Sequence, residues 1–338
     1  YPLWYLQEVE GYRTDVRIIN YNLLGTDWQN MELFSKVNKA DAIPMIWSKE
    51  DMRGDNMEVT PYVEDPRVPQ NQFFTLEDVI RFAINPKNRV RGMDGRPLPY
   101  IPTKNFVQPL DKEALINNGL VNAADSAYIP DAIQIVLDKN AAYRADMALM
   151  NIIAGVAKDG WRRPIYFTNG TPNMGLSAYF QNQGLLNKLV PVRNPNAIPG
   201  IPTFTDLDKN IELLTKTYTF GLANTDKVYY DEKNRVMFIN YLMTASELAN
   251  NLSAVGRKED AIKVLDDIMT RISRSSYPYE MVAGYDNRGS IPAIIDAYYR
   301  AGAPEKARVY ANIMSDNLQR FSNYIFELSK RSQPATTQ

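Results

Sequence analysis

The chain of 338 residues contains no histidine and no cysteine. These two absences exclude histidine-based catalytic triads, thiol nucleophiles, zinc sites with thiolate ligands, iron–sulfur clusters and dithiol redox motifs. A bound metal ion would need oxygen ligands, which favours calcium or magnesium. The lack of disulfides leaves the cellular compartment open, because a protein of an oxidising space can also lack them.

The sequence also lacks an excess of charge of one sign and a long apolar run. Its 38 basic and 39 acidic residues give a formal net charge of -1, so we expect no nucleic-acid partner. No apolar run approaches the roughly 20 residues that cross a bilayer, and no secretory signal is present at the start. The chain opens with the aromatic stretch 1–6 and no initiating methionine, so we interpret it as a piece of a longer protein.

Length and composition indicate two folded domains. The chain of 338 residues exceeds the size of one typical domain, about 100–200 residues. Its 45% apolar and 23% charged residues are ordinary for a globular protein with a sizeable core. We expect an α/β domain over residues 1–205, followed by an all-α helical domain over residues 206–338.

The α/β expectation rests on the order of the predicted elements. Residues 132–137 and 164–168 have the composition of strands, and residues 141–157 between them have helical spacing. Strand, helix and strand in this order predict a βαβ unit, so we expect a mostly parallel sheet. Residues 16–19 predict a further short strand.

A loop-rich insertion is predicted at about residues 52–110. Prolines are frequent in it, and only residues 75–84 have helical spacing together with a capping threonine. Several aromatic residues between the prolines can bury apolar surface, which favours an ordered segment over a disordered one.

The last third of the chain contains an internal repeat with tetratricopeptide-like spacing. A glycine that lets the chain turn is followed five residues later by an alanine that lets two helices approach closely. We expect two such repeats, at about residues 241–270 and 290–329. Seven positions recur at a constant offset of 46 residues: Leu248, Ala249, Leu252, Gly256, Ala261, Leu265 and Ile268 correspond to Ile294, Ile295, Tyr298, Gly302, Ala307, Ala311 and Met314.

The segment from Asn22 to Trp28 is the most distinctive candidate for a ligand site. It ends in Asp27 and Trp28, and a carboxylate beside an indole is a common way to hold a sugar. The segment lies between a predicted strand and a predicted helix, where α/β proteins place ligands. The alternative is that Thr26 and Gln29 form a capping box and that the tryptophan belongs to the core.

Arg162 and Arg163 form a second candidate, between a predicted helix and a predicted strand. Two guanidinium groups can hold a phosphate or a carboxylate through paired hydrogen bonds. The alternative is a simpler role, because cations are also stabilising near the C-terminus of a helix.

The 21 tyrosines could line a carbohydrate groove, and Tyr298-Tyr299 is one of their clusters. Because tetratricopeptide grooves hold extended or helical peptides, Tyr298 and Tyr299 are also candidates for protein contact. Alternatively they pack between helices in the core. No catalytic residue can be assigned, because the fold and not the sequence sets the separation of paired carboxylates. Acidic stretches at 94–95 and 231–234 lack the alternating spacing of a calcium loop, so we predict no metal site and no cofactor.

Three strings of the sequence carry a resemblance to a known family. They are 1–11 with 13–17, 23–28 and 161–167. Together they resemble the extracytoplasmic C-terminal part of a bacterial family of multi-pass membrane proteins, long catalogued as a domain of unknown function. That family is similar to animal protein O-mannosyltransferases of the endoplasmic reticulum. The resemblance extends over nearly the whole chain and includes the tetratricopeptide-like helices.

This resemblance implies a part of a membrane-embedded glycosyltransferase that moves a lipid-linked sugar to serine or threonine of exported proteins. It implies a location on the periplasmic, extracytoplasmic face of the inner membrane. The chain would contact the lipid-linked sugar and the membrane only through a separate membrane region of the protein. Family members carry an acidic Gly-Asp-Asn-Asp-Thr string before the position of Tyr1, which this sequence does not contain. No catalytic residue is therefore carried over.

We accordingly expect a domain that binds exported acceptor proteins or partner subunits and is not itself catalytic. One alternative is a self-contained carbohydrate-active enzyme that uses two carboxylates. Another is a purely structural interaction domain, since a fold does not determine a function.

Overall fold

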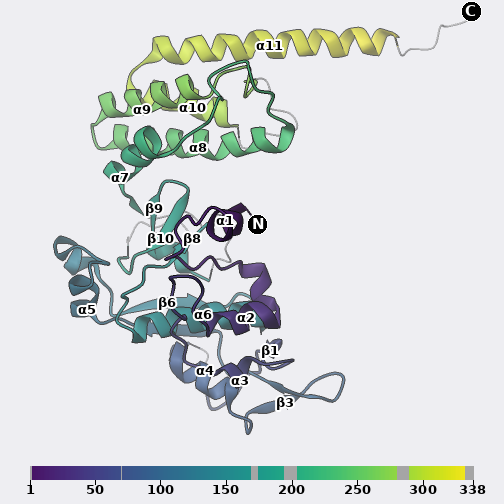
Figure 1. Ribbon diagram of the computed structural model, residues 1–338, viewed down its shortest axis with the longest axis vertical. Helices are drawn as coiled ribbons and strands as arrows, with labels where there is room; N and C mark the ends of the chain where they lie inside the picture. The colour runs from purple at the N-terminus through teal and green to yellow at the C-terminus, as the bar shows by residue number, and fades with distance from the viewer. Residues whose placement is uncertain (1, 70, 169–173, 194–203, 280–288, 332–338) are drawn as a thin grey trace, which may run out of the picture. The chain divides into compact units, whose positions relative to one another are not determined.

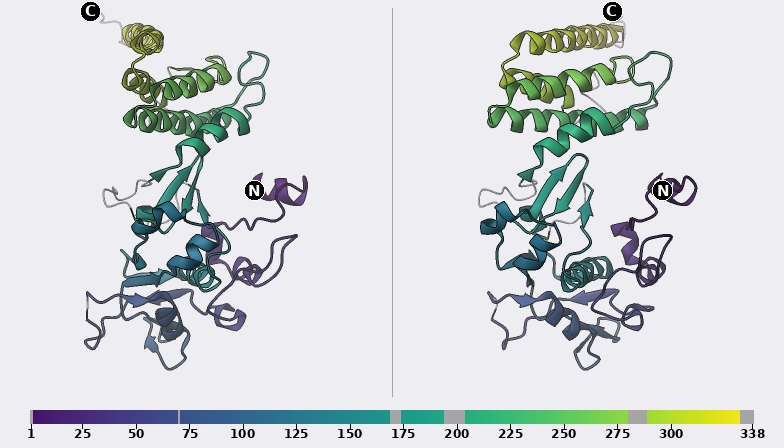
Figure 2. Two further views of the ribbon diagram at one scale, coloured as in Figure 1. Left: turned by 90° about the vertical axis from the view of Figure 1, so that its left-hand side faces the viewer. Right: turned by 60° about the vertical axis from the view of Figure 1, so that its left-hand side comes forward.

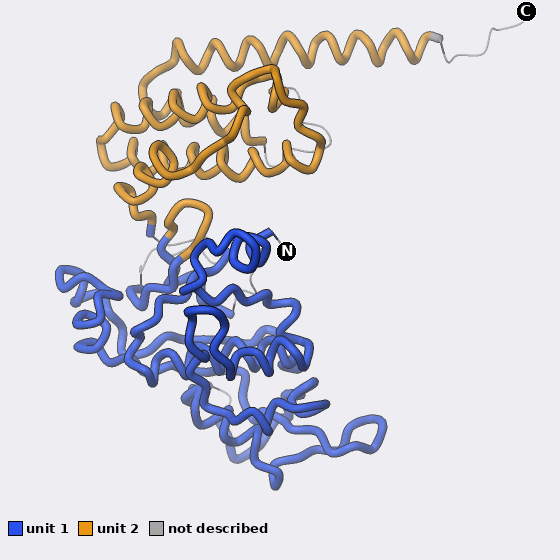
Figure 3. The backbone as a smooth tube through the Cα atoms, in the orientation of Figure 1, with its two compact units in different colours: residues 1–181, 188–204 blue, residues 182–187, 205–338 orange. Residues whose placement is uncertain are grey.

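The computed structural model describes residues 2–69, 71–168, 174–193, 204–279 and 289–331. The chain forms two compact units, coloured separately in Figure 3. Unit 1 comprises residues 1–181 and 188–204, and unit 2 comprises residues 182–187 and 205–338. Unit 1 combines short strands with helices, whereas unit 2 is mostly helical (Figures 1 and 2).

The first half of the chain alternates between short elements and loops. Its described elements are α1 (Pro2–Glu8), the 3-10 helix η1 (Tyr21–Gly25), α2 (Asp27–Leu33), α3 (Lys49–Met52), β1 (Val59–Pro61), β2 (Phe74–Thr75), α4 (Leu76–Ile84), β3 (Arg89–Arg91), β4 (Pro97–Pro99), β5 (Asn105–Pro109), α5 (Lys112–Asn117), η2 (Ala123–Tyr128), β6 (Ala132–Val136), β7 (Ala141–Tyr143), α6 (Arg144–Lys158), β8 (Tyr166–Phe167), η3 (Leu176–Tyr179), β9 (Phe180–Gln183), β10 (Leu186–Leu189) and β11 (Phe204–Thr205). The expected mixture of helices and strands is confirmed.

The described sheets are small and mixed, so the expectation of a mostly parallel sheet is wrong. β2 pairs with β5 in parallel, whereas β5 with β6, β1 with β7 and β3 with β4 are antiparallel. β8 belongs to a different sheet, of order β11-β9-β10-β8, so β6 and β8 do not form the predicted βαβ unit. The reason is that β6 takes its partner from the proline-rich insertion: β5 pairs with it over five residues. Among the described residues, the predicted strand at 16–19 is not formed.

Helix α6 is the centre of the core of unit 1. Its residues are buried without a break from Arg144 to Val156, so it packs on all sides. Gly155 is required there, because a Cβ atom would lie only 1.9 Å from the carbonyl oxygen of Pro44. The buried Asn151 accepts a hydrogen bond at Oδ1 from the backbone N–H of Ile46 over 2.6 Å. The segment around residues 43–47 is therefore fixed against this helix.

Unit 2 contains the helical region that the sequence predicts. Its described elements are α7 (Leu207–Glu212), the π-helix η4 (Leu213–Thr217), α8 (Glu232–Ala254), α9 (Lys258–Arg271), α10 (Ser290–Ala301) and α11 (Pro304–Arg331), together with the tip of the β9–β10 hairpin and the end of β11. Gly256 and Gly302 have φ angles of 84° and 85° and occupy the turns α8–α9 and α10–α11. Ala261 and Ala307 are fully buried one turn into the second helix of each hairpin. The repeat in the sequence thus corresponds to two helical hairpins.

Candidate functional site

Unit 1 contains a cleft of about 860 Å³ beside its N-terminal segment. The wall is built from α1, parts of the stretches 13–24, 39–43 and 163–168, and one face of α6. Its ionisable side chains are mainly basic: Arg13, Arg17, Lys39 and Arg163, against Asp15 and Asp41. Leucine, isoleucine, valine and aromatic side chains form much of the remaining surface. The cleft therefore offers apolar contact together with an excess of positive charge.

The segment Arg17–Ile19 lines this cleft and has an unpaired backbone. In the described part of the chain, no hydrogen bond reaches the N–H or C=O groups of these three residues. The next residue, Asn20, has extended backbone angles, φ -91° and ψ 114°. All four residues line the cleft. A non-helical segment with open backbone donors and acceptors can accept an added strand.

Side chains hold the N-terminal end of this segment in place. The buried Gln7 amide donates to the carbonyls of Arg13 and Val16, each over 2.8 Å. Arg17 donates to the carbonyl of Ser35 over 2.7 Å and to that of Glu32 over 3.0 Å. The segment is thus anchored by Gln7 and by the Arg17 side chain, while the main-chain groups of residues 17–19 remain unpaired among the described residues.

The structure separates the two predicted arginines. Arg162 is exposed and forms an ion pair with Asp159 at the end of α6, which agrees with a simple helix-end role. Arg163 lines the cleft and donates to the carbonyls of Asp41 and Ala42 over 3.1 and 2.9 Å. Burial lowers the pKa of Arg17 below its usual value, the neighbouring carboxylate of Glu32 opposes this, and the charge of Arg163 adds to the lowering.

Asn22 lines the cleft, but Asp27 does not. Oδ1 of Asp27 accepts a hydrogen bond from the N–H of Gly54 over 3.1 Å and lies 4.0 Å from the guanidinium of Arg144. The expected capping box is not formed, because Thr26 makes no side-chain cap and donates instead to the carbonyl of Leu23 over 2.6 Å. Asp27 therefore has a structural role at the start of α2.

Trp28 is not a core residue, since 54% of it is exposed. Its ring meets that of Trp4 edge to face, with centroids 6.5 Å apart. Trp4 lines the cleft, whereas Trp28 does not. Through its contact with Trp4, Trp28 lies next to the cleft. An indole pair with one exposed and one partly buried ring can contact either a sugar or a peptide.

A buried charge network supports the cleft at Tyr21. The Tyr21 hydroxyl donates to Oδ1 of Asp146 over 2.5 Å, and Lys139 donates to both oxygens of that carboxylate over 2.8 Å. The backbone N–H of Tyr143 donates to Oδ2 over 2.9 Å. Burial, and then the hydrogen bond to Asp146, raise the pKa of Tyr21 well above its usual value. The hydroxyl therefore stays protonated at the cleft.

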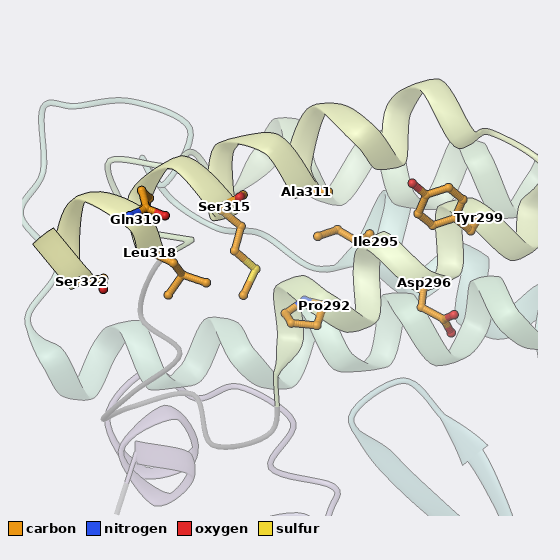
Figure 4. Close-up of a pocket in the computed structure, with 10 residues that line it drawn as sticks. Pro292, Ile295, Asp296, Tyr299, Ala311, Ser315, Leu318, Gln319 and Ser322 are labelled. Carbon is orange, nitrogen blue, oxygen red and sulfur yellow. The ribbon is translucent and has the colours of Figure 1, made fainter.

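Unit 2 has a groove of about 610 Å³ between α10 and α11, shown in Figure 4. Tyr299 lines it and is 47% exposed, as a protein-contact residue requires. Tyr298 is fully buried, so its side chain cannot contact a partner. The prediction that Tyr298 contacts a partner protein is therefore wrong, and Tyr298 is a core residue.

Sequence reasoning did not identify Arg17, Tyr21 or Asp146. Arg17 belongs to one of the strings that carry the family resemblance, which was the available signal. The link from Tyr21 to Asp146 spans 125 residues and has no local pattern. Among the residues that the structure describes, no three acidic side chains are grouped to hold a metal ion.

The cleft lies in the part of the chain that a family model matches. A family model described as TMEM260-associated domain 2 matches residues 1–210, which include all residues that line the cleft. None of the curated proteins and none of the solved structures matches the chain. Within the described ranges, no helix has both the length and the apolar character that a bilayer span needs. The chain belongs to the TMEM260-associated domain 2 family, a domain of a membrane-associated family.

Proposed function

We propose that this domain binds an extended segment of an acceptor polypeptide in the cleft of unit 1. The observation that supports the proposal most is the open backbone of Arg17–Ile19 along the cleft wall. An extended peptide can pair with such a backbone by strand addition. Main-chain hydrogen bonds give affinity that depends little on sequence, which suits a protein that must accept many substrates.

The side chains of the cleft add limited selectivity. Arg17 and Arg163 lie on its wall and favour a peptide with an acidic or strongly polar group nearby. Apolar residues of α6, including Leu149 and Ile152, favour one or two apolar side chains in the same peptide. Trp4 and Trp28 at the adjoining surface can contact a sugar already attached to the acceptor.

We further propose that the domain acts on the extracytoplasmic side of a membrane glycosyltransferase related to the protein O-mannosyltransferases. Membership of a membrane-associated family and the resemblance of the opening strings support this context. Glycoside hydrolysis would need a carboxyl group with a raised pKa. Two hydrogen bonds from Arg13 lower the pKa of Asp15, a cleft carboxylate, below its usual value. This favours binding over catalysis by the domain itself.

Peptide binding can be tested with proline substitutions in the cleft segment. Adjacent residues of an extended chain point their N–H groups to opposite edges. Ile18→Pro and Ile19→Pro each remove one N–H group, and only one of these two groups can lie on the edge that pairs with the ligand. The variant that loses this group should no longer bind a fluorescent serine- and threonine-rich peptide. The other variant should bind the peptide only somewhat more weakly than the unaltered chain. Ile18→Ala and Ile19→Ala are the matched controls, because they keep the backbone donors.

The ligand offers a second control. A peptide methylated at alternate backbone nitrogens should bind at least about tenfold more weakly, since each lost hydrogen bond contributes on the order of 1 kcal/mol. Equal binding by the proline and alanine variants would refute strand addition. Turnover of aryl glycosides or sugar phosphates by the isolated chain would instead support the enzymatic alternative.

A further inference from the structure

The C-terminal half of α11 carries an exposed apolar stripe. The stripe starts where α11 packs in its own unit, at the buried Ala307 and the partly buried Met314. It then continues at alternating steps of four and three residues, the spacing of a heptad seam. Its outer members are Leu318 (41% exposed), Phe321 (56%), Ile325 (47%) and Leu328 (38%).

Helix α11 is longer than the helices it packs against. It spans 28 residues, whereas α10 spans 12. Figure 1 shows α11 running past the end of the other helices of unit 2. Leu318 lines the end of the α10–α11 groove, so the stripe continues the groove along α11 (Figure 4). Large apolar side chains on an extended surface of this kind indicate an interaction site.

We propose that this stripe is a self-association surface, on which α11 of a second copy of the chain lies antiparallel. The positions of the stripe are symmetric about Asn323, so two antiparallel copies of α11 can place apolar residues opposite each other. In that register Leu318 faces Leu328 of the second copy, and Phe321 faces its Ile325. Each large apolar residue therefore meets another, as the layers of a coiled coil require.

The positions that flank the stripe favour such close pairing. Ser315, Ser322 and Ser329 recur every seven residues along one side of it. Small uncharged residues there let two helices approach without like charges meeting. The charged Arg320 and Glu327 lie two residues after Leu318 and Ile325, on the side of the helix away from the seam.

A membrane surface fits the segment less well. The acidic Asp316 and Glu327 offset two of the three basic residues Arg320, Lys330 and Arg331, so the segment has only a small net positive charge to attract anionic lipids. Lys330 lies over the ring of Phe326 at 4.3 Å and forms an ion pair with Glu327 at 2.9 Å. These contacts are exposed and weak, but they give the Lys330 ammonium group partners within its own helix.

Sedimentation velocity over a concentration series tests the proposal. We expect the whole chain to form dimers. The dimer dissociation constant of the double variant Phe321→Ser/Ile325→Ser should be higher by on the order of 100-fold, since the variant removes two large apolar residues from each helix. Phe326→Ser is the matched control, because Phe326 is equally exposed at 59% but lies off the stripe. It should dimerise like the unaltered chain. Circular dichroism shows whether the double variant keeps its helix content.

Disulfide trapping tests the register independently of stability. The chain has no cysteine, so a single introduced cysteine can pair only with its own copy in the partner. Ser322→Cys should form a disulfide-linked dimer under mild oxidation, because Ser322 lies beside the two-fold axis of the proposed pairing. Asn323→Cys points away from the seam and should remain unlinked.

Three results would overturn the proposal. They are a monomer at all concentrations, a dimer that tolerates the double substitution, and equal trapping of both cysteine variants. Binding of the monomeric chain to phosphatidylglycerol vesicles, lost in Phe321→Ser/Ile325→Ser, would assign the stripe to a membrane instead. The peptide-binding assay on the unit 1 cleft is a separate measurement, so its failure leaves this test unaffected.

Discussion

The ring of Tyr298 is stacked on the ring of Tyr310, with centroids 5.7 Å apart and planes inclined by 12°. The Tyr298 hydroxyl donates to Oδ1 of Asp266 over 3.0 Å. Burial, followed by the charges of Tyr310 and Asp266, raises the pKa of Tyr298 far above its usual value. Tyr298 therefore joins α9, α10 and α11 as a neutral hydrogen-bond donor.

Substitution of the two neighbouring tyrosines should give opposite results. Tyr298→Ala leaves a cavity in the core of unit 2 and should lower the free energy of unfolding by about 3–5 kcal/mol. Tyr299→Ala removes a half-exposed side chain and should cost less than about 1 kcal/mol. Urea unfolding followed by circular dichroism at 222 nm measures both values. Similar losses for the two variants would contradict the assignment of Tyr298 to the core.

Gly155→Ala should severely destabilise unit 1. The added methyl group would lie 1.9 Å from the Pro44 carbonyl oxygen, so the packing between α6 and the 43–47 segment has to shift. We expect a cost of about 1–3 kcal/mol or more, as for other overpacked cores. Gly25→Ala is the matched control, because its Cβ would meet no atom within 4 Å. Thermal melting of the two variants distinguishes steric conflict from a general effect of replacing glycine.

Tyr21→Phe tests the network behind the cleft. It removes a hydrogen bond to a buried carboxylate, and such bonds to charged groups contribute about 1.5–3 kcal/mol. We therefore expect a loss of this size in urea unfolding. Tyr12→Phe, at a side chain that is 65% exposed, should leave stability unchanged. An unchanged Tyr21→Phe would mean that Lys139 and the N–H of Tyr143 satisfy Asp146 without the Tyr21 hydroxyl.

The ion pairs of Glu77 should make stability depend on pH. Hydrogen bonds from Arg81, and then from Lys158, lower the pKa of Glu77 below its ordinary value of 4.5. Because the folded pKa is the lower one, the contribution is present above about pH 4.5 and is lost as the pH falls through the folded pKa. Glu77→Gln should cost at most about 1 kcal/mol at pH 7, since these groups are partly exposed and screened by solvent.

The control for this prediction is Glu10→Gln, at an exposed position outside the described ion pairs. Its difference from the unaltered chain should stay near zero at every pH. For Glu77→Gln the difference should shrink toward zero below pH 4.5. If the stability difference between Glu77→Gln and the unaltered chain grew as the pH fell, a lowered pKa of Glu77 would be contradicted.

Local patterns predicted helices better than sheets. Thr75 caps α4 as expected, accepting a hydrogen bond from the N–H of Asp78 over 3.1 Å. The helix predicted at 141–157 is confirmed as α6, and the repeated glycines mark real helical turns. Strand partners could not be predicted in the same way. Whether β6 pairs with β5 or with β8 depends on contacts between distant segments, which no periodicity encodes.

The candidate site, like the sheets, could be predicted only in part from the sequence. The Asn22 and Arg163 candidates both line the cleft, although 141 residues separate them in sequence. Arg162 has the same side chain as its neighbour but pairs with Asp159, because successive residues point in different directions. Sequence therefore identified the region, whereas only the fold determined which of the two arginines lines the cleft.

The double hydrogen bond of Gln7 has a mechanical consequence. One amide from α1 holds the carbonyls of both Arg13 and Val16, immediately before the open segment of the cleft. A displacement of α1 would thus pull on residues 13–16, which lead into the cleft wall. The N-terminal helix, which also lines the cleft, is therefore coupled through one side chain to the stretch that leads into Arg17–Ile19.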